Sequence, residues 1–161
     1  MEMRWSFSAP AAGVGNLAVQ LAHHAGARLL GVGRGRDRAA TLEAGASAFA
    51  DPDHEPLPNP TDMSLVLDTV SGPLARSGAV ALGSSGRFVS IVDPTPQLVG
   101  SRGTFFVVAP DRASLTEIAR RVDERLLSPV LGRQADLSDA AEPLEAKELG
   151  SATGKVSIKV R

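Results

Sequence analysis

The most constraining feature of the sequence is its regular alternation of short apolar segments with segments of helical periodicity. Strands are expected at residues 4–8, 28–33, 46–50, 64–67, 87–92 and 104–109, and helices near 14–25, 37–44, 73–82 and 114–126. Helices placed between strands are typical of a parallel sheet, because parallel neighbours need long crossover connections. We therefore predict an α/β fold of the Rossmann type, a doubly wound parallel six-stranded sheet with helices on both faces.

The first helix has the clearest pattern. Its apolar residues recur at helical spacing and form one stripe, and Gly26 ends it. The stripe comprises Val14, Leu17, Ala18, Leu21, Ala22 and Ala25. One side of this helix is therefore expected to pack on the sheet.

The last part of the chain is less regular. A capping-box spacing at Ser114 to Glu117 predicts the start of a helix with Leu115 and Ile118 on one face. Beyond Pro129 we expect only a helix over 138–148, limited by Pro143, and a strand over 155–160. Residues 51–62 hold four prolines and four acids and are expected to form a surface loop.

Composition excludes several classes of function. The net charge of -1 and the lack of a basic run argue against nucleic acid as a partner. No run reaches the ~18 apolar residues of a membrane span. Residues 7–22 are mostly apolar, but they lack the basic start of a secretory signal and continue into a patterned helix. We expect a cytoplasmic protein.

The sequence offers little for a metal site. The absence of cysteine excludes disulfides, thiolate catalysis and four-cysteine zinc sites. His23, His24 and His54 are the only histidines, and none has metal-ligand spacing with acids. We therefore expect no zinc or other metal.

Small residues dominate the junction between the first strand and the first helix, at residues 9–15 (APAAGVG). The first N–H groups of a helix have no intrahelical partner and carry partial positive charge, so a phosphate can bind there. Glycine lets a diphosphate approach the backbone closely. The junction predicts a dinucleotide site, with a simple tight turn as the alternative.

Three arginines, Arg34, Arg36 and Arg38, follow the end of the second strand at Gly33. In a dinucleotide-binding sheet this strand end meets the adenosine ribose, where an acid selects NAD and arginine accommodates the 2′-phosphate of NADP. Gly33 stands in the place of the acid, and guanidinium groups pair well with phosphate. The pattern favours NADP(H), and a solvated basic turn is the alternative.

Five segments resemble the cofactor-binding domain of the quinone oxidoreductases, a branch of the medium-chain dehydrogenase/reductase superfamily, and of its zinc-binding dehydrogenases. They are residues 13–22 (GVGNLAVQLA), 44–46 (AGA), 65–72 (LVLDTVSG), 86–92 (GRFVSIV) and 154–156 (GKV). The resemblance covers nearly the whole chain in order and carries no information about the substrate.

The resemblance implies a role for each part of the expected sheet edge. The diphosphate would contact the backbone of Ala12, Gly13 and Val14. The adenosine and its ribose would lie beside Thr69 and Val70. The nicotinamide would lie near Ile91, Phe105, Phe106 and Val107. The resemblance identifies no catalytic residue.

Three departures from the family pattern qualify these roles. Ala12 replaces the middle glycine of the family's turn, and Pro52 stands near the place of a tyrosine that contacts the 2′-phosphate in relatives. The third departure is the lack of the family's barrel-like N-terminal catalytic domain. We therefore expect a truncated protein, with a dinucleotide-binding domain over 1–130 and a tail over 131–161 that packs on the catalytic domain in relatives.

Three functions remain open from the sequence. The first is an NADP(H)-binding oxidoreductase component that reduces a small enone, quinone or related carbonyl, with a separate catalytic-domain partner. The second is a repurposed Rossmann protein without redox chemistry, such as a cyclase, isomerase or lyase, which Ala12 and the missing tyrosine motivate. The third is an interaction module that forms a homodimer through strand 104–108, as relatives do.

Overall fold

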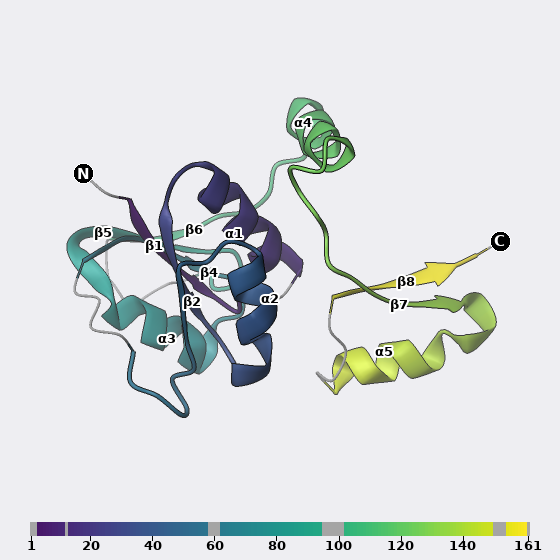
Figure 1. Cartoon of the computed structure of the whole chain (residues 1–161), viewed down its shortest axis with the longest axis horizontal. Coiled ribbons are helices and arrows are strands. Elements are labelled where there is room, and N and C mark those ends of the chain that lie inside the picture. Colours follow the sequence, from purple (N-terminus) through teal and green to yellow (C-terminus); the bar gives the residue numbers. More distant parts are fainter. Residues whose placement is uncertain (1–2, 12, 58–61, 95–101, 150–153, 161) are drawn as a thin grey trace.

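Six parallel strands form a single sheet in the order β3-β2-β1-β4-β5-β6 (Figure 1). The computed structural model describes residues 3–11, 13–57, 62–94, 102–149 and 154–160. The strands are β1 Arg4–Ser8, β2 Arg28–Val32, β3 Ala48–Ala50, β4 Met63–Asp68, β5 Leu82–Ser90 and β6 Gly103–Phe105. This order confirms the predicted Rossmann-type fold, in which ligands bind at the carboxyl edge where the strand order reverses.

Helices cover both faces of the sheet (Figure 1). They are α1 Gly13–His24, the 3-10 turn η1 Gly35–Asp37, α2 Arg38–Glu43 and α3 Gly72–Val80. A further helix, α4 Arg112–Asp123, lies away from the sheet. On one face Val19 of α1 packs in a buried cluster with Phe7. On the other, Ala75 of α3 packs with Val66 and Phe88. These two clusters form the hydrophobic core and hold the strands of the sheet in place.

Two strand boundaries differ from the prediction by more than two residues. β5 begins at Leu82 rather than at 87, because a register irregularity lets its first residues pair with Met63. Gly86 makes this possible, since a Cβ there would lie 2.3 Å from the Met63 carbonyl oxygen. β6 ends at Phe105, and the following segment to Pro110 forms no strand.

Asp111 caps the N-terminus of α4. Its carboxylate accepts hydrogen bonds from the backbone N–H groups of Ala113 (3.3 Å) and Ser114 (2.8 Å). The prediction that the capping box starts at Ser114 is wrong, because the helix begins two residues earlier, at Arg112. The Ser114 hydroxyl instead donates to the capping carboxylate at 2.6 Å.

The charged side of α4 is a network of ion pairs. Glu117 accepts from Arg120 at 2.8 Å and from Arg121 at 2.7 Å. These two guanidinium groups lower the pKa of Glu117 to about 2. On the apolar side Leu115 is 62% exposed and Ile118 43% exposed, so α4 presents an uncovered apolar surface.

The C-terminal residues form a small unit beside the main sheet (Figure 1). Its elements are β7 Leu131–Asp136, the 3-10 turn η3 Leu137–Asp139, α5 Ala141–Glu148 and β8 Lys155–Lys159. β7 and β8 pair in parallel as a separate two-stranded sheet. Pro143 is the third residue of α5, where its missing N–H has no intrahelical partner to lose, so the helix continues past it. β7 was not predicted.

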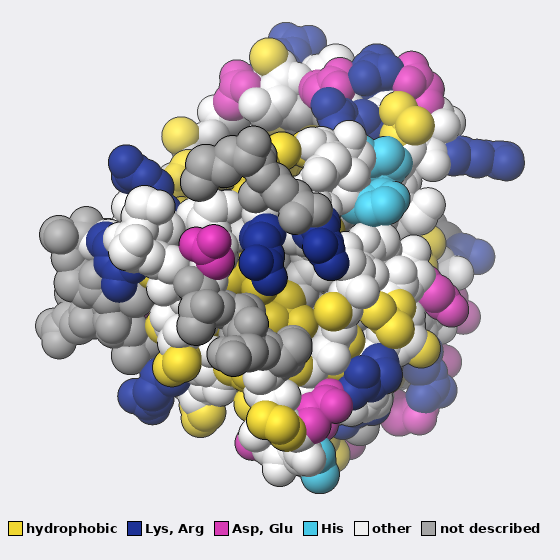
Figure 2. Space-filling view, turned by 60° about the vertical axis from the view of Figure 1, so that its left-hand side comes forward, with side chains coloured by type: hydrophobic (Ala, Val, Ile, Leu, Met, Phe, Trp, Pro, Cys, Tyr) yellow, Lys and Arg dark blue, Asp and Glu magenta, His cyan; other side chains and the backbone are white. Residues whose placement is uncertain are grey.

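The surface carries mixed charge. On the face drawn in Figure 2, Lys and Arg side chains are interspersed with Asp, Glu and hydrophobic ones. The described part of this face therefore offers no continuous basic surface of the kind that binds a nucleic-acid backbone. Within the described ranges, no helix combines the length and apolar character needed to cross a membrane.

Replacing Gly15 by alanine should destabilise the fold. The new Cβ would lie 2.4 Å from the Ala9 carbonyl oxygen, so the helix or the turn must shift. Overpacking of this kind costs about 2 kcal/mol, more than the ~1 kcal/mol that alanine gains over glycine in a helix. Urea denaturation measures the change. Gly33→Ala is the matched control, because its Cβ has only ordinary contacts from 3.4 Å outward. Equal stability of the two variants would contradict the proposed close contact.

Candidate nucleotide-binding site

The chain leaves β1 through a tight turn at the carboxyl edge of the sheet. Ala9 has a φ of 50°, in the left-handed region that few non-glycine residues adopt, and its N–H donates to Val32 at 2.9 Å. Pro10 then lies over β2, where a Cβ on Gly31 would be 2.9 Å from its ring. Together with Gly15, these contacts bring the start of α1 close to the strand ends.

Gly13 begins α1, and the end of the Lys155 side chain lies directly over it. A Cβ on Gly13 would be 2.4 Å from Lys155 Cε and 2.9 Å from its Nζ. Of the other residues predicted to contact a diphosphate, Val14 is 52% exposed, and Ala12 lies outside the described residues. The sequence contained Lys155 in its family-like GKV segment, but no role was predicted for it.

A hollow of about 470 Å³ lies beside this turn, at the ends of β1, β2, β3 and β4. It is lined by Ala9, Arg34, Asp37, Pro52, Asp53, Val70, Ser71, Pro73, Leu74 and Ser77. Arg34 is the one cation among these lining residues, and Asp37 and Asp53 are the acids. The hollow thus combines an apolar wall with charged groups of both signs at the position where this fold binds adenosine.

The structure separates the three arginines that follow β2. Arg34 lines the hollow, whereas Arg38 pairs with the Glu55 carboxylate and donates to the Phe49 carbonyl oxygen at 3.2 Å. Its guanidinium also lies 4.9 Å from the centre of the Phe49 ring. Arg36 lines a second, neighbouring hollow together with Arg38 and Glu55. Arg38 therefore stabilises the segment after β3 through its contacts with Phe49 and Glu55, and it does not line the first hollow.

A buried carboxylate holds the arginine segment in place. Asp51 accepts hydrogen bonds from the Gly35 N–H at 2.7 Å, the Asp53 N–H at 3.1 Å and the His54 ring at 3.0 Å. Burial alone would raise the pKa of Asp51, but the hydrogen bonds from Asp53, Gly35 and His54 outweigh it and lower that pKa. The segments that follow β2 and β3 are thereby joined next to Arg34.

Asp68, fully buried at the end of β4, organises the next turn. One of its oxygens accepts from the N–H groups of Val70 (3.1 Å) and Ser71 (2.8 Å), and the other accepts from the Ser90 hydroxyl at 2.8 Å. Ser71 has a φ of 61°, which these bonds hold in place. Asp68 thus ties the ends of β4 and β5 together.

Thr69 and Val70 differ in their contacts, although both were predicted to line the adenosine side. The Thr69 hydroxyl donates to the Ser8 carbonyl oxygen at 2.8 Å and so joins β4 to β1. Val70 lines the hollow and is 42% exposed. Gly33, predicted to replace the ribose-binding acid, is buried, and its N–H donates to Ala50 at 3.1 Å.

The residues predicted to lie near the nicotinamide follow two adjacent strands. Ile91 comes directly after β5, and its N–H donates to the Asp68 carbonyl oxygen at 3.1 Å. The Phe106 N–H donates to Ser90, so Phe106 and Ile91 leave the sheet side by side. Phe106 is 56% exposed and Val107 67% exposed, and Phe105, at the end of β6, is also exposed. These residues lie at one edge of the sheet, where Ile91 is half-buried and the other three side chains are exposed.

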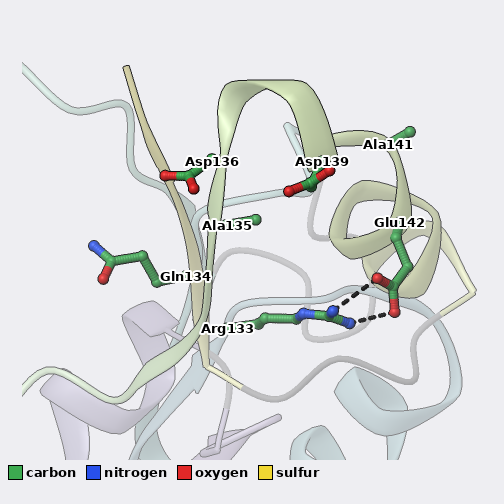
Figure 3. A pocket seen from close by; sticks show the side chains of 7 residues that line it. All are labelled: Arg133, Gln134, Ala135, Asp136, Asp139, Ala141 and Glu142. Carbon is green, nitrogen blue, oxygen red and sulfur yellow. Dashed lines mark hydrogen bonds and ion pairs between the residues drawn. The ribbon is translucent and has the colours of Figure 1, made fainter. Parts of the chain in front are cut away.

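A further hollow, of about 460 Å³, belongs to the C-terminal unit (Figure 3). The Arg133 guanidinium points at the Glu142 carboxylate and donates to it at 2.7 Å. This contact raises the pKa of Arg133. Because its central cation is already paired with Glu142, this hollow is a weaker candidate for an anionic ligand than the one at Arg34.

The histidines occupy ordinary surface positions. The His24 ring is hydrogen bonded to the Gln20 carbonyl oxygen at 2.8 Å, and His23 packs beside Gly45. Across the described ranges, no three His, Asp or Glu side chains are grouped so that they could hold a metal ion.

Comparison with known proteins agrees with this architecture. The structure of the quinone oxidoreductase from Coxiella burnetii is 25% identical and matches 99% of this chain and 54% of its own, with a TM-score of 0.88. The quinone oxidoreductase from Thermus thermophilus, whose structures include a complex with NADPH, is 26% identical, with coverages of 99% and 58% and a TM-score of 0.78. A mycobacterial protein complexed with NADPH, at 18% identity, 99% and 58% coverage and a TM-score of 0.76, shares the fold. No curated protein matches the sequence.

The sheet order and the turn that opens α1 define a Rossmann-type domain. A model of the zinc-binding dehydrogenase family matches residues 44–158, and the chain belongs to this family. The resemblance seen in the sequence is thus confirmed. The chain spans about half the length of the structures that it matches.

Replacing Ser90 by alanine should lower the free energy of unfolding by about 2 kcal/mol, since it removes a buried donor to Asp68 and leaves that oxygen unsatisfied. The same hydroxyl accepts from the N–H groups of Val92 (3.2 Å) and Asp93 (2.8 Å), so the turn after β5 should also loosen. Thermal and urea unfolding measure the loss. Ser85→Ala, at an exposed position of the same strand, is the control, and an equal effect of both variants would refute the role of the buried bond.

Proposed function

We propose that this chain is the NADP(H)-binding half of an oxidoreductase similar to the quinone oxidoreductases. The observation that carries the proposal is the hollow at the carboxyl edge, where Arg34 lies beside the turn that opens α1. The two relatives at 25% and 26% identity are both quinone oxidoreductases, and one was solved with NADPH. A small enone, quinone or related carbonyl is the proposed substrate class.

The residues present fit such a nucleotide. Pro52, Val70 and Leu74 offer an apolar wall to an adenine ring, and Arg34 offers a guanidinium to a 2′-phosphate. The N–H groups at the start of α1 face the place of the diphosphate. Gly13 has no side chain, and the flexible end of the Lys155 side chain lies over it.

The chemistry of hydride transfer comes from the bound nicotinamide, and the chain's own residues hold and orient it. Ile91 and Phe106 leave the sheet side by side and would support one face of the ring. Exposed Phe106 and Val107 need a cover to exclude water from that region. We propose that a catalytic domain, which corresponds to the other half of the matched structures, supplies that cover.

Arg34→Met should raise the Kd for NADPH about 10- to 100-fold and leave the Kd for NADH within about twofold, because a charged hydrogen bond contributes roughly 1.5–3 kcal/mol. Fluorescence titration of the two nucleotides measures both values. Arg38→Met is the control: Arg38 is paired with Glu55, so its loss should lower stability without changing the NADPH-to-NADH ratio.

Two results of this titration would count against the proposal. If the wild-type chain binds neither nucleotide up to millimolar concentration, the redox function fails and a repurposed, non-redox protein is favoured. If both arginine variants lose NADPH equally, Arg34 is not the residue that recognises the 2′-phosphate.

We also propose a homodimer formed through residues 104–108. β6 is the last strand of the sheet order, so its outer edge is open among the described residues. Val107 is 67% exposed and Val108 74% exposed, and the apolar side of α4, with Leu115 and Ile118, is also uncovered. Edge pairing with a second copy would bury these side chains.

Val108→Glu should convert the dimer to a monomer, because it places a charge in the proposed apolar interface. Light scattering coupled to size exclusion at micromolar concentration measures the mass. Val80→Glu is the matched control, since Val80 is 80% exposed on α3, away from β6, and should leave the mass unchanged. A wild-type monomer, or a dimer that Val108→Glu leaves intact, would refute this interface.

A further inference from the structure

We propose that Asp51 is a positioning residue for nucleotide selectivity: its carboxylate fixes the backbone beside Arg34 and so places that guanidinium where a 2′-phosphate would bind. The inference rests on the proposed function, because it takes Arg34 as the residue that recognises the 2′-phosphate. Asp51 itself does not line the hollow that Arg34 lines, so its effect on the nucleotide passes through the position of another side chain.

The first support is that the place of the Arg34 side chain depends on its backbone. Within the described part of the chain, its exposed guanidinium has no ion pair to hold it. The backbone of Arg34 is extended, with φ -79° and ψ 146°. Before it, the Gly33 N–H donates to the Ala50 carbonyl oxygen at 3.1 Å. After it, the Gly35 N–H donates to the Asp51 carboxylate at 2.7 Å. Two hydrogen bonds to consecutive residues therefore flank the arginine.

The second support is that only one of these two bonds depends on a side chain. Ala50 accepts through its backbone, as any residue could there, whereas Asp51 accepts through its carboxylate. That carboxylate is buried, and its other oxygen accepts from the Asp53 N–H at 3.1 Å. The Asp51 N–H donates to Glu55 at 3.0 Å, so the residue is held on both its backbone and its side chain. The backbone beside Arg34 therefore depends on the chemical identity of residue 51.

The third support is that the charge of Asp51 has the wrong sign for a phosphate site. A carboxylate near Arg34 weakens the positive potential that attracts phosphate, and Asp37 and Asp53 already place acids in the wall of the hollow. Burial raises the pKa of Asp51, but hydrogen bonds from two backbone N–H groups and a histidine ring lower it overall, so the group is ionised at neutral pH. The anion gains a charge-assisted hydrogen bond from Gly35. Position and charge thus act in opposite directions on phosphate binding.

Asp51→Asn separates the two effects. Asparagine keeps the size of the side chain but has one acceptor oxygen, so it cannot replace both the oxygen that faces Gly35 and the oxygen that faces Asp53. We expect the Kd for NADPH and for adenosine 2′-monophosphate to rise about tenfold, the order of one weakened charge-assisted contact at Arg34. The Kd for NADH should stay within about twofold. Calorimetric titration of the full chain measures the three values, and a melting curve verifies folding.

Gly35→Pro removes the donor of the same hydrogen bond and leaves every charge in place. Proline suits the first residue of the η1 turn, and Arg34 before it already has the extended backbone that a following proline requires. The same loss of preference for NADPH over NADH is expected. The double variant should lose no more than either single variant, because both remove one bond.

Asp53→Asn is the matched control. It removes an acid from the wall of the hollow and leaves the Asp53 N–H in place, so NADPH should bind more tightly. If Asp51→Asn also tightens NADPH, or leaves it unchanged, the carboxylate does not position Arg34 and the proposal is overturned. An equal rise in the Kd for NADPH and NADH would overturn it too, because that is the effect of a purely structural residue.

The three ligands also distinguish this inference from the proposed function. A wild-type chain that binds adenosine 2′-monophosphate but neither dinucleotide would refute the redox function, whereas loss of that mononucleotide in Asp51→Asn would still support the role of Asp51. If the wild type prefers NADPH and Asp51→Asn keeps the same preference, only the inference is refuted. A wild-type chain that binds none of the three ligands would refute both.

Discussion

The close approach of α1 to the end of β1 is the constraint on which the rest of the structure depends. Gly15 has no side chain, so the helix can lie against the Ala9 carbonyl oxygen, and the positive φ of Ala9 directs the chain into that position. This contact sets the depth at which Val19 enters the core beside Phe7. It also aims the free N–H groups of the first helical turn at the carboxyl edge, where the hollow lies. The packing of α1 and the proposed binding of a phosphate thus depend on the same contact.

The arginines near the hollow have different roles: one stabilises the fold through an ion pair, and another is available to a ligand. The sequence placed Arg34, Arg36 and Arg38 together, and their spacing could not distinguish their roles. Arg38 is paired with Glu55, a residue of the proline-rich loop whose carboxylate also accepts from the backbone N–H of Asp51, directly after β3. Only the tertiary structure brings these groups together, and it leaves Arg34 as the cation that lines the hollow.

Periodicity was enough to predict the sheet and most of its helices, because strand and helix patterns are local and the core is continuous along them. Periodicity failed for elements whose stability depends on residues far away in the sequence. β7 is mostly exposed and polar, and it is a strand only because β8 pairs with it. Lys155 belongs to a family-like segment, but its place over Gly13 depends on how the C-terminal unit packs against α1. The Asp111 cap was missed because the Ser114 to Glu117 spacing gave a competing start.

A two-stranded sheet is marginally stable by itself, so the C-terminal unit depends on what it contacts. On one side it is held by α1 through Gln20 and Ser128, and on the other Leu131 and Leu149 are 77% and 83% exposed. The proposed catalytic domain would stabilise this unit by covering these leucines, because a partner that binds only the folded form shifts the folding equilibrium towards it.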